Sequence, residues 1–236
     1  MNVKNGWVVN PFANRALFQV PAFIGNYYPA RVCTPIALVL HEPQEQADGR
    51  ESTPVWFQNP DAHASTRWYS DNDGDLYQCV PFPAAAIANG LDGRPEPRFN
   101  DGGPEFNGAS LNNLTDNIEV EGYTHSISQT LTEAQYQGLC DWLVMGYLHW
   151  NLPRNTGRVL SHFQISKDRS DGEWLRTKSG VVQEAVNRVL QIEKDIRDLK
   201  GYAYRDAQRI NGLETNVWTQ ALRLNDLEKH TAHPPK

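Results

Sequence analysis

The sequence contains only three cysteines in 236 residues, Cys33, Cys79 and Cys140, and no CxxC pair. This excludes a disulfide framework and the common cysteine zinc and redox motifs, so we interpret all three as buried apolar thiols. The longest unbroken aliphatic run, residues 36–40, is far shorter than the ~20 apolar residues of a membrane helix. The start, MNVKNGWVVNPF, lacks the charged and then apolar pattern of a signal peptide. We therefore expect an unexported protein without a membrane anchor.

Positive charge is also scarce. The 22 lysines and arginines face 28 aspartates and glutamates, which gives a net charge of −6. A nucleic-acid partner held through its phosphates is therefore not expected, nor is binding to a membrane surface by charge. The 39% hydrophobic content is sufficient for one sizeable core, so disorder of the whole chain is excluded.

Proline, glycine and aromatic residues become rare after residue 175. Residues 1–175 hold 13 of the 15 prolines and 21 of the 24 aromatics, and their net charge is −9, whereas residues 176–236 carry +3. The first part has the composition of a loop-rich globular domain, and the second that of one long helix. We predict an N-terminal extension at 1–33, to which no element is assigned, a globular domain at 34–175 and a helical segment at 176–236.

Apolar residues recur every three and four positions through residues 182–227. Of the 14 positions in this series, 12 are apolar, the exceptions being Asp206 and Gln220. A strict 3.5-residue repeat over this length is typical of a coiled-coil seam, because a lone surface helix drifts from that register. We predict a parallel coiled coil of two or three copies, or a stalk that docks on another protein. The alternative is a helix that folds back on its own domain.

The globular part alternates predicted strands and helices. Residues 36–40 suit a strand buried on both faces, which ends at His41. Residues 68–80 contain an Asp-Gly turn and predict a hairpin. In residues 117–121 the alternation puts Glu119 and Glu121 together on one sheet face. Residues 132–135 form a capping box that opens a helix, and residues 159–160 predict a strand that ends at His162. Together these elements predict an α/β fold with a mixed central sheet and flanking helices.

Two predicted strands thus end in histidine, and Asp168 and Asp171 follow the second of them. A histidine pair with a carboxylate is a donor set for catalytic zinc, which takes three protein ligands and leaves a fourth position for water. Each residue alone is weak support, because a histidine at a strand end is more often a surface residue. Their common order along the chain favours a metal site.

Five short motifs follow in a fixed order. They are a strand ending in His41, Asn-Pro and Ala-Ser at 59–60 and 64–65, a hairpin at 71–81, Ile-Glu-Val-Glu-Gly at 118–122, and Ser-His with Arg-Ser-Asp at 161–162 and 169–171. This order resembles the zinc-dependent N-acetylmuramoyl-L-alanine amidases (amidase type 2), which share a fold with peptidoglycan-recognition proteins and with phage amidase lysins. The resemblance covers about residues 34–175.

The resemblance implies that His41, His162 and Asp171 bind Zn²⁺, with Asp168 as the alternative third ligand because Gly172 replaces the proline that commonly follows. It implies Glu119 as the catalytic acid and base. Arg169 stands where lysine is usual and would stabilise an oxyanion without donating a proton. The alternative for Arg169 is a surface ion pair.

The function that the resemblance implies is hydrolysis of the amide between the lactyl group of N-acetylmuramic acid and L-alanine in bacterial peptidoglycan. Without a signal peptide, the chain fits a phage lysin that passes from the host cytoplasm to the cell wall, or a virion-associated tail component. A different class remains open, namely a non-catalytic wall-binding or virion structural protein that keeps the fold. The departures at residues 66–69 and 86–89 favour that alternative.

Overall fold

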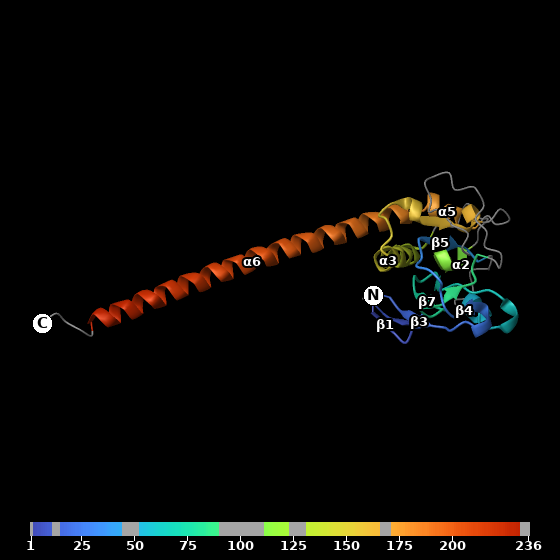
Figure 1. The fold of residues 1–236 in the computed structure, drawn as a ribbon. Helices are drawn as coiled ribbons and strands as arrows, with labels where there is room; N and C mark the ends of the chain where they lie inside the picture. Colours follow the sequence, from blue (N-terminus) through green and yellow to red (C-terminus); the bar gives the residue numbers. More distant parts are fainter. Residues whose placement is uncertain are drawn as a thin grey trace. The chain divides into compact units, whose positions relative to one another are not determined.

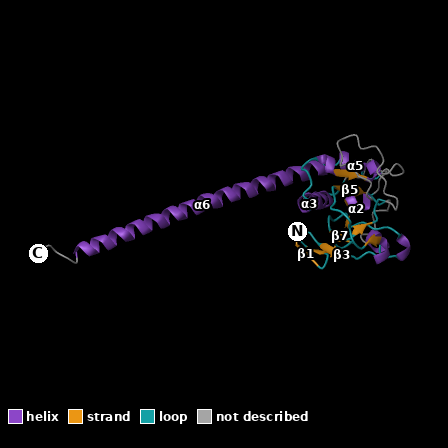
Figure 2. Cartoon of the chain, in the orientation of Figure 1, coloured by secondary structure: helices purple, strands orange, loops and turns teal. Residues whose placement is uncertain are grey.

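The computed structural model divides the chain into two compact units, Met1–Val189 and Leu190–Lys236. It describes six stretches of chain, with side chains as far as residue 223: 2–10, 15–43, 52–89, 111–122, 131–165 and 171–231. No helix among these residues is both long enough and apolar enough to cross a membrane. Figure 1 labels the elements along the chain, and Figure 2 shows which are helices and which are strands.

The first unit is built on a six-stranded sheet with the order β10-β5-β9-β6-β7-β3. Its strands are β3 (Leu17–Gln19), β5 (Ala37–His41), β6 (Trp68–Ser70), β7 (Leu76–Gln78), β9 (Thr115–Val120) and β10 (Val159–Ser161). Strands β10, β5, β9 and β6 are mutually parallel, and β7 is antiparallel to β6. The sheet is thus mixed, as the sequence predicts.

Helices and smaller elements complete the chain. Two small sheets pair β1 (Asn2–Lys4) with β2 (Trp7–Val9) and β4 (Tyr27–Tyr28) with β8 (Ala85–Ala86). The α-helices are α1 (Ser52–Trp56), α2 (Leu111–Leu114), α3 (Glu133–His149), α4 (His162–Ile165), α5 (Glu173–Thr177) and α6 (Val181–Thr231). Three short 3₁₀ turns are η1 (Ile24–Asn26), η2 (Pro60–Ala62) and η3 (Thr156–Arg158).

Strand β5 is buried on both faces, as its continuous apolar run predicts. Leu38 and Leu40 face the main core, which also contains the apolar side of α3 and the first two turns of α6. Ala37 and Val39 face a smaller cluster with residues of α2, β10 and α4. Because both faces are covered, the ends of the strands are the accessible part of the sheet.

The predicted capping box starts α3. The Thr132 hydroxyl accepts the Gln135 N–H at 3.0 Å, which satisfies one of the helix's open amide groups. The Gln135 side chain donates instead to the Glu121 carbonyl oxygen at 2.7 Å. This bond ties the start of α3 to the end of β9.

Residues 1–33, which carry no assigned element in the sequence analysis, are part of the first unit. They contribute β1 to β4, and β3 lies parallel to β7 at the edge of the main sheet. A three-residue strand without alternation gives no local signal, so only its pairing with β7 reveals it.

The predicted long helix is present as α6, one unbroken helix of 51 residues (Figure 1). The first turns of α6 are predicted to form part of the coiled-coil seam, but in the structure they belong to the core of the first unit. Val182, Ala185 and Val189, the first three positions of the predicted seam, are buried in the main core of the first unit. They pack with α3, and the Arg188 side chain donates to Gln137 on α3 at 2.6 Å. The part of the seam that a partner can use therefore begins at Ile192.

Candidate metal centre

Two neighbouring parallel strands bring the predicted histidines together. Ser161 on β10 is in register with Leu40 on β5, so the next residues, His162 and His41, leave the sheet at the same edge. The two strands are separated by more than a hundred residues, and their pairing makes the two histidines neighbours. A parallel sheet places the carboxyl ends of its strands together, which explains why strand-end residues form the site.

Asp171 joins the two histidines. The distance from His41 Nδ1 to His162 Nδ1 is 3.0 Å, from His162 Nδ1 to Asp171 Oδ2 is 3.1 Å, and from His41 Nδ1 to Asp171 Oδ2 is 3.7 Å. All three residues are buried, with exposed fractions of 1%, 7% and 5%. The side chains therefore converge on one point below the surface.

These three donors fit zinc. Four donors at about 2.0–2.1 Å from a zinc ion stand about 3.3 Å apart in a tetrahedron, which is the range of the three distances here. Imidazole nitrogen and carboxylate oxygen are also the donor types of catalytic zinc sites, and three of them leave one position open. Among the described residues, this is the one group of histidine, cysteine and carboxylate side chains placed to hold a metal ion.

Asn117 orients His41, and sequence reasoning missed it. His41 Nε2 lies 3.3 Å from Asn117 Oδ1 on the neighbouring strand β9. A neutral imidazole that donates its Nε2–H to this oxygen leaves the Nδ1 lone pair for the metal. The signal was present in the sequence, since Asn117 stands two residues before Glu119 and therefore on the same face of β9.

The segment around Asp171 is held in place by the backbone. The Phe163 N–H donates to the Asp171 carbonyl oxygen at 3.2 Å, and the Glu42 N–H lies 3.4 Å from Asp171 Oδ2. The next residue, Gly172, has a φ of +79°, and a Cβ there would collide with the Leu40 carbonyl oxygen. Only glycine fits this conformation and space, which explains the departure from proline noted in the sequence.

Burial and charge act in opposite directions on Asp171. Burial alone would raise the pKa of its carboxyl group, but the hydrogen bond with His162 and the nearby imidazoles lower it below its ordinary value. The side chain is thus held in the carboxylate form, which is the form that binds metal.

A cavity of about 220 Å³ opens beside two of the three donors. His162, Asp171 and the half-buried Glu119 border it, so a carboxylate that is not part of the donor group faces the same space. The rest of the lining comes from other loops: Glu42, Pro43, Phe57, Ala64, Ser65, Ile87 and Ala88. The altered segment at 86–89 thus contributes to the wall of this cavity.

Solved structures share this arrangement of elements. Matches include a selenomethionine derivative of AmpD, with 22% identity, a TM-score of 0.50 and coverage of 76% of this chain and 98% of that one. A mutant endolysin from Bacillus subtilis has 16% identity and a TM-score of 0.52, covering 72% and 99%. Staphylococcus aureus AmiA, solved with its ligand, has 14% identity and a TM-score of 0.55, covering 78% and 87%. No protein-family model and no curated protein matches the sequence.

The chain has the type 2 amidase fold. This confirms the resemblance and the α/β fold class that the sequence motifs imply. His41 and His162 stand at the ends of β5 and β10, as the strand patterns of the sequence predict.

The structure brings together His41, His162 and Asp171 of the predicted residues and places Glu119 at the same cavity. Arg169 and the alternative ligand Asp168 lie outside the described residues. Glu121, expected on the same sheet face as Glu119, follows the end of β9 and accepts the Asn72 N–H at 2.8 Å. It does not border the cavity, so the predicted pair contributes a single carboxylate to it.

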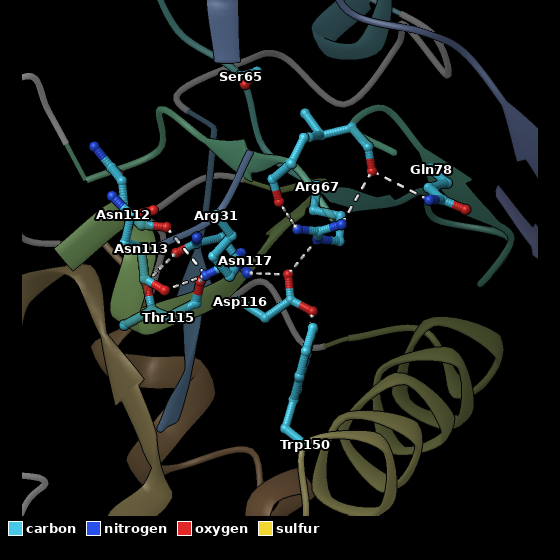
Figure 3. A network of polar contacts seen from close by, with 12 residues as sticks. Arg31, Ser65, Arg67, Gln78, Asn112, Asn113, Thr115, Asp116, Asn117 and Trp150 are labelled. Carbon is cyan, nitrogen blue, oxygen red and sulfur yellow. Dashed lines mark hydrogen bonds and ion pairs between the residues drawn. The ribbon is translucent and has the colours of Figure 1, made fainter. Parts of the chain in front are cut away.

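A buried ion pair fixes the start of β9 (Figure 3). Arg67, which is fully buried, donates to Asp116 Oδ1 at 2.8 Å and to the carbonyl oxygens of Val80 and Ala84. The other Asp116 oxygen accepts from Trp150 Nε1 at 3.0 Å. Because Asp116 directly precedes Asn117, this network holds the strand that presents Asn117 and Glu119.

Arg31 completes this network from the other side. Its guanidinium donates to the carbonyl oxygens of Asn112, Asn113 and Thr115, at the junction of α2 and β9 (Figure 3). Burial and the neighbouring Arg67 lower the pKa of Arg31 to about 10. Arg67 thus holds the Asp116 carboxylate directly, while Arg31 binds the neighbouring backbone through one nitrogen, Nη1.

Proposed function

We propose that the protein is a zinc-dependent N-acetylmuramoyl-L-alanine amidase that hydrolyses bacterial peptidoglycan. One observation carries the proposal: His41, His162 and Asp171 form a zinc donor group, and two of them, His162 and Asp171, border a cavity together with Glu119, a carboxylate outside that group. Amide hydrolysis needs these components, because water must be activated and a proton must reach the leaving amine. The type 2 amidase fold supports the same conclusion.

His41, His162 and Asp171 would hold the zinc ion, and Asn117 would keep His41 in the tautomer that binds through Nδ1. The chemistry that a bound zinc supplies is activation of water and polarisation of the amide carbonyl. Glu119 accepts the proton of the attacking water and returns it to the nitrogen of L-alanine as the bond breaks. Arg169 would stabilise the negative charge on the carbonyl oxygen.

The biological setting belongs to the same proposal. We place the protein among phage lysins, as an endolysin that reaches the wall from the host cytoplasm or as a virion-associated enzyme. An endolysin among the matching structures supports the first setting. The long helix α6 supports a role in joining copies or in attachment to a virion, because its described side chains beyond Val189 are largely exposed.

Purified cell walls test the activity. Incubation with the full chain and zinc should release stem peptides that begin with a free L-alanine amine, identified by mass. A chelator should stop the release, and added zinc should restore it. Binding to walls without release under any metal condition would overturn the amidase and support a non-catalytic wall-binding protein.

His162→Ala tests the metal site independently of turnover. Two remaining donors do not hold zinc in an open site, so the zinc content of the purified variant should fall from one ion per chain to none. His149→Ala is the matched control, since His149 is an exposed histidine at the end of α3. Stoichiometric zinc in His162→Ala would contradict the assignment of this ligand.

A further inference from the structure

The part of α6 that follows Val189 exposes a row of large apolar side chains. Ile192, Ile196, Leu199, Ile210, Leu213 and Val217 have exposed fractions between 36% and 66%. All of them stand at the two apolar positions of one seven-residue repeat, and Ala203 continues the row. Within the described residues this row is the largest set of apolar side chains in regular order that the chain leaves uncovered. An uncovered apolar row of this kind indicates a surface that binds a partner.

The shape of the row indicates that its partner is another helix. A hollow of about 530 Å³ lies between Ile210, Leu213, Glu214, Val217 and Trp218. The first four stand at i, i+3, i+4 and i+7 on the helix. Four residues with this spacing form the hole that receives one side chain of a facing helix in a coiled coil. In a parallel pair of identical helices, the side chain that enters this hole is the partner's residue at position 213.

Charges beside the row agree with the same partner. In a parallel, in-register pair, each seven-residue repeat begins at the first of its two apolar positions, such as residue 196 or 210. The residue that directly precedes this position faces, on the other helix, the residue five positions later in the sequence. Asp195 then faces Lys200, and Arg209 faces Glu214. Both contacts join opposite charges, and each occurs twice in a symmetric pair. Side-chain charges on this helix thus favour a second copy aligned residue by residue.

We propose that residues 192–217 of α6 bind a second copy of this chain as a parallel, in-register coiled coil. The pairing does not depend on the amidase function, because it uses only side chains of the second unit. Asp206 is the weak point of the seam, since in this alignment it meets the same aspartate of the partner. Like charges at a seam position reduce the affinity of the pair.

Two leucine substitutions test the apolar row. In the full chain, Leu213→Gln removes a seam leucine, while Leu222→Gln removes a leucine of similar exposure, 57% against 63%, from the opposite side of the helix. Sedimentation equilibrium should give twice the 26.7 kDa chain mass for the unaltered protein. We expect Leu213→Gln to weaken association about 100-fold or more and Leu222→Gln to leave it within about twofold. A single-chain mass for the unaltered protein, or equal weakening by both variants, would overturn the proposal.

Charge reversal tests the alignment. Asp195→Lys and Lys200→Glu each create like-charge contacts in their own pairs, so each should associate about 10-fold more weakly than the unaltered chain. When the two variants are mixed, position 195 of one chain meets position 200 of the other with opposite charges again. The mixture should therefore recover the original affinity. Absence of recovery would contradict the parallel, in-register arrangement, because that alignment restores both contacts in the mixed pair.

Asp206→Leu tests the seam by a change that should strengthen association. Replacing the facing aspartates by leucine removes the repulsion and adds apolar contact, so association should become about 10-fold tighter or more. The circular dichroism of α6 should stay helical in all these variants. Weaker association of Asp206→Leu would show that position 206 does not face the partner, which contradicts the seam.

Discussion

The two ends of α6 carry the same apolar repeat but differ in what covers it. Val182, Ala185 and Val189 are buried in the main core of their own domain, with exposed fractions of 2%, 0% and 0%. Ile196, Leu199 and Leu213, at equivalent positions of the repeat, are 46% to 66% exposed. An apolar repeat therefore predicts which face of a helix will be buried, but it does not predict whether the same domain or another chain buries it.

The largest expected effect follows from this difference. A chain ending at Ser179 loses five buried core residues, Val181, Val182, Ala185, Val186 and Val189. Each fully buried valine contributes about 1.5–3 kcal/mol, so the loss is of the order of the whole stability of a domain. We expect this chain to be unfolded by circular dichroism. A chain ending at Leu190 should keep a cooperative thermal transition. If the chains ending at Ser179 and at Leu190 folded equally well, the first turns of α6 would not be needed for the fold of the domain.

Glu119→Gln separates the chemistry of the first unit from the association of the second. Glutamine keeps the shape and removes the proton acceptor, so the rate of stem-peptide release should fall ~100-fold or more while zinc is retained. Leu213→Gln should do the reverse, with altered association and unchanged release from soluble wall fragments. The control for the acid is Glu121→Gln, which changes a carboxylate outside the cavity. Near-normal release by Glu119→Gln would assign the base to another group.

Asn117→Leu should weaken the metal site without touching a ligand. Loss of the contact with His41 Nε2 frees the imidazole to rotate or change tautomer, so zinc affinity should fall about 10- to 100-fold in competition with a chelator. Asn89→Leu is the matched control, because Asn89 is also a buried asparagine near β9 but bonds to Thr115 rather than to a histidine. An equal loss in both variants would indicate general loosening of the strand.

The smallest expected effect is also the most direct comparison of the two ends of α6. Val189→Ala and Val217→Ala make the same change at equivalent positions of the repeat, with exposed fractions of 0% and 65%. The first should lower the free energy of unfolding of the domain by about 1–3 kcal/mol in urea titrations. The second should leave that value unchanged and weaken association about 10-fold. If both variants lowered the free energy of unfolding, or if both weakened association, the two ends of α6 would not have different roles.

The sequence was sufficient to predict the strands that hold the metal donors. The apolar run before His41, the short strand before His162 and the Thr132 N-cap before α3 are local signals, and the structure contains the two strands and the helix that they predict. The donor group could be predicted because residues at the carboxyl ends of neighbouring parallel strands meet at one edge. The motif order supplied which strands are neighbours, a relation that no single segment contains.

The rest depends on contacts that local patterns do not encode. Arg67 and Asp116 are charged residues, which sequence reasoning places at the surface, yet they pair with each other in the interior. Asn117 looks like an ordinary polar residue until His41 lies beside it. The three residues of β3 become a strand only through β7, and the burial of Val189 depends on α3, more than forty residues earlier in the chain.

The continuity of α6 across residue 189 has a consequence for how the helix forms. Starting a helix is the unfavourable step, with a nucleation constant of about 10⁻³, whereas each added residue costs little. The turns from Val181 to Val189 are held by the packed core, so the folded domain supplies a finished helical nucleus. Residues from Leu190 onward then lengthen an existing helix. A separate peptide of residues 190–231 has to nucleate its own first turn. In the full chain the folded domain removes this step, and so it promotes formation of the helix that carries the apolar row of residues 192–217.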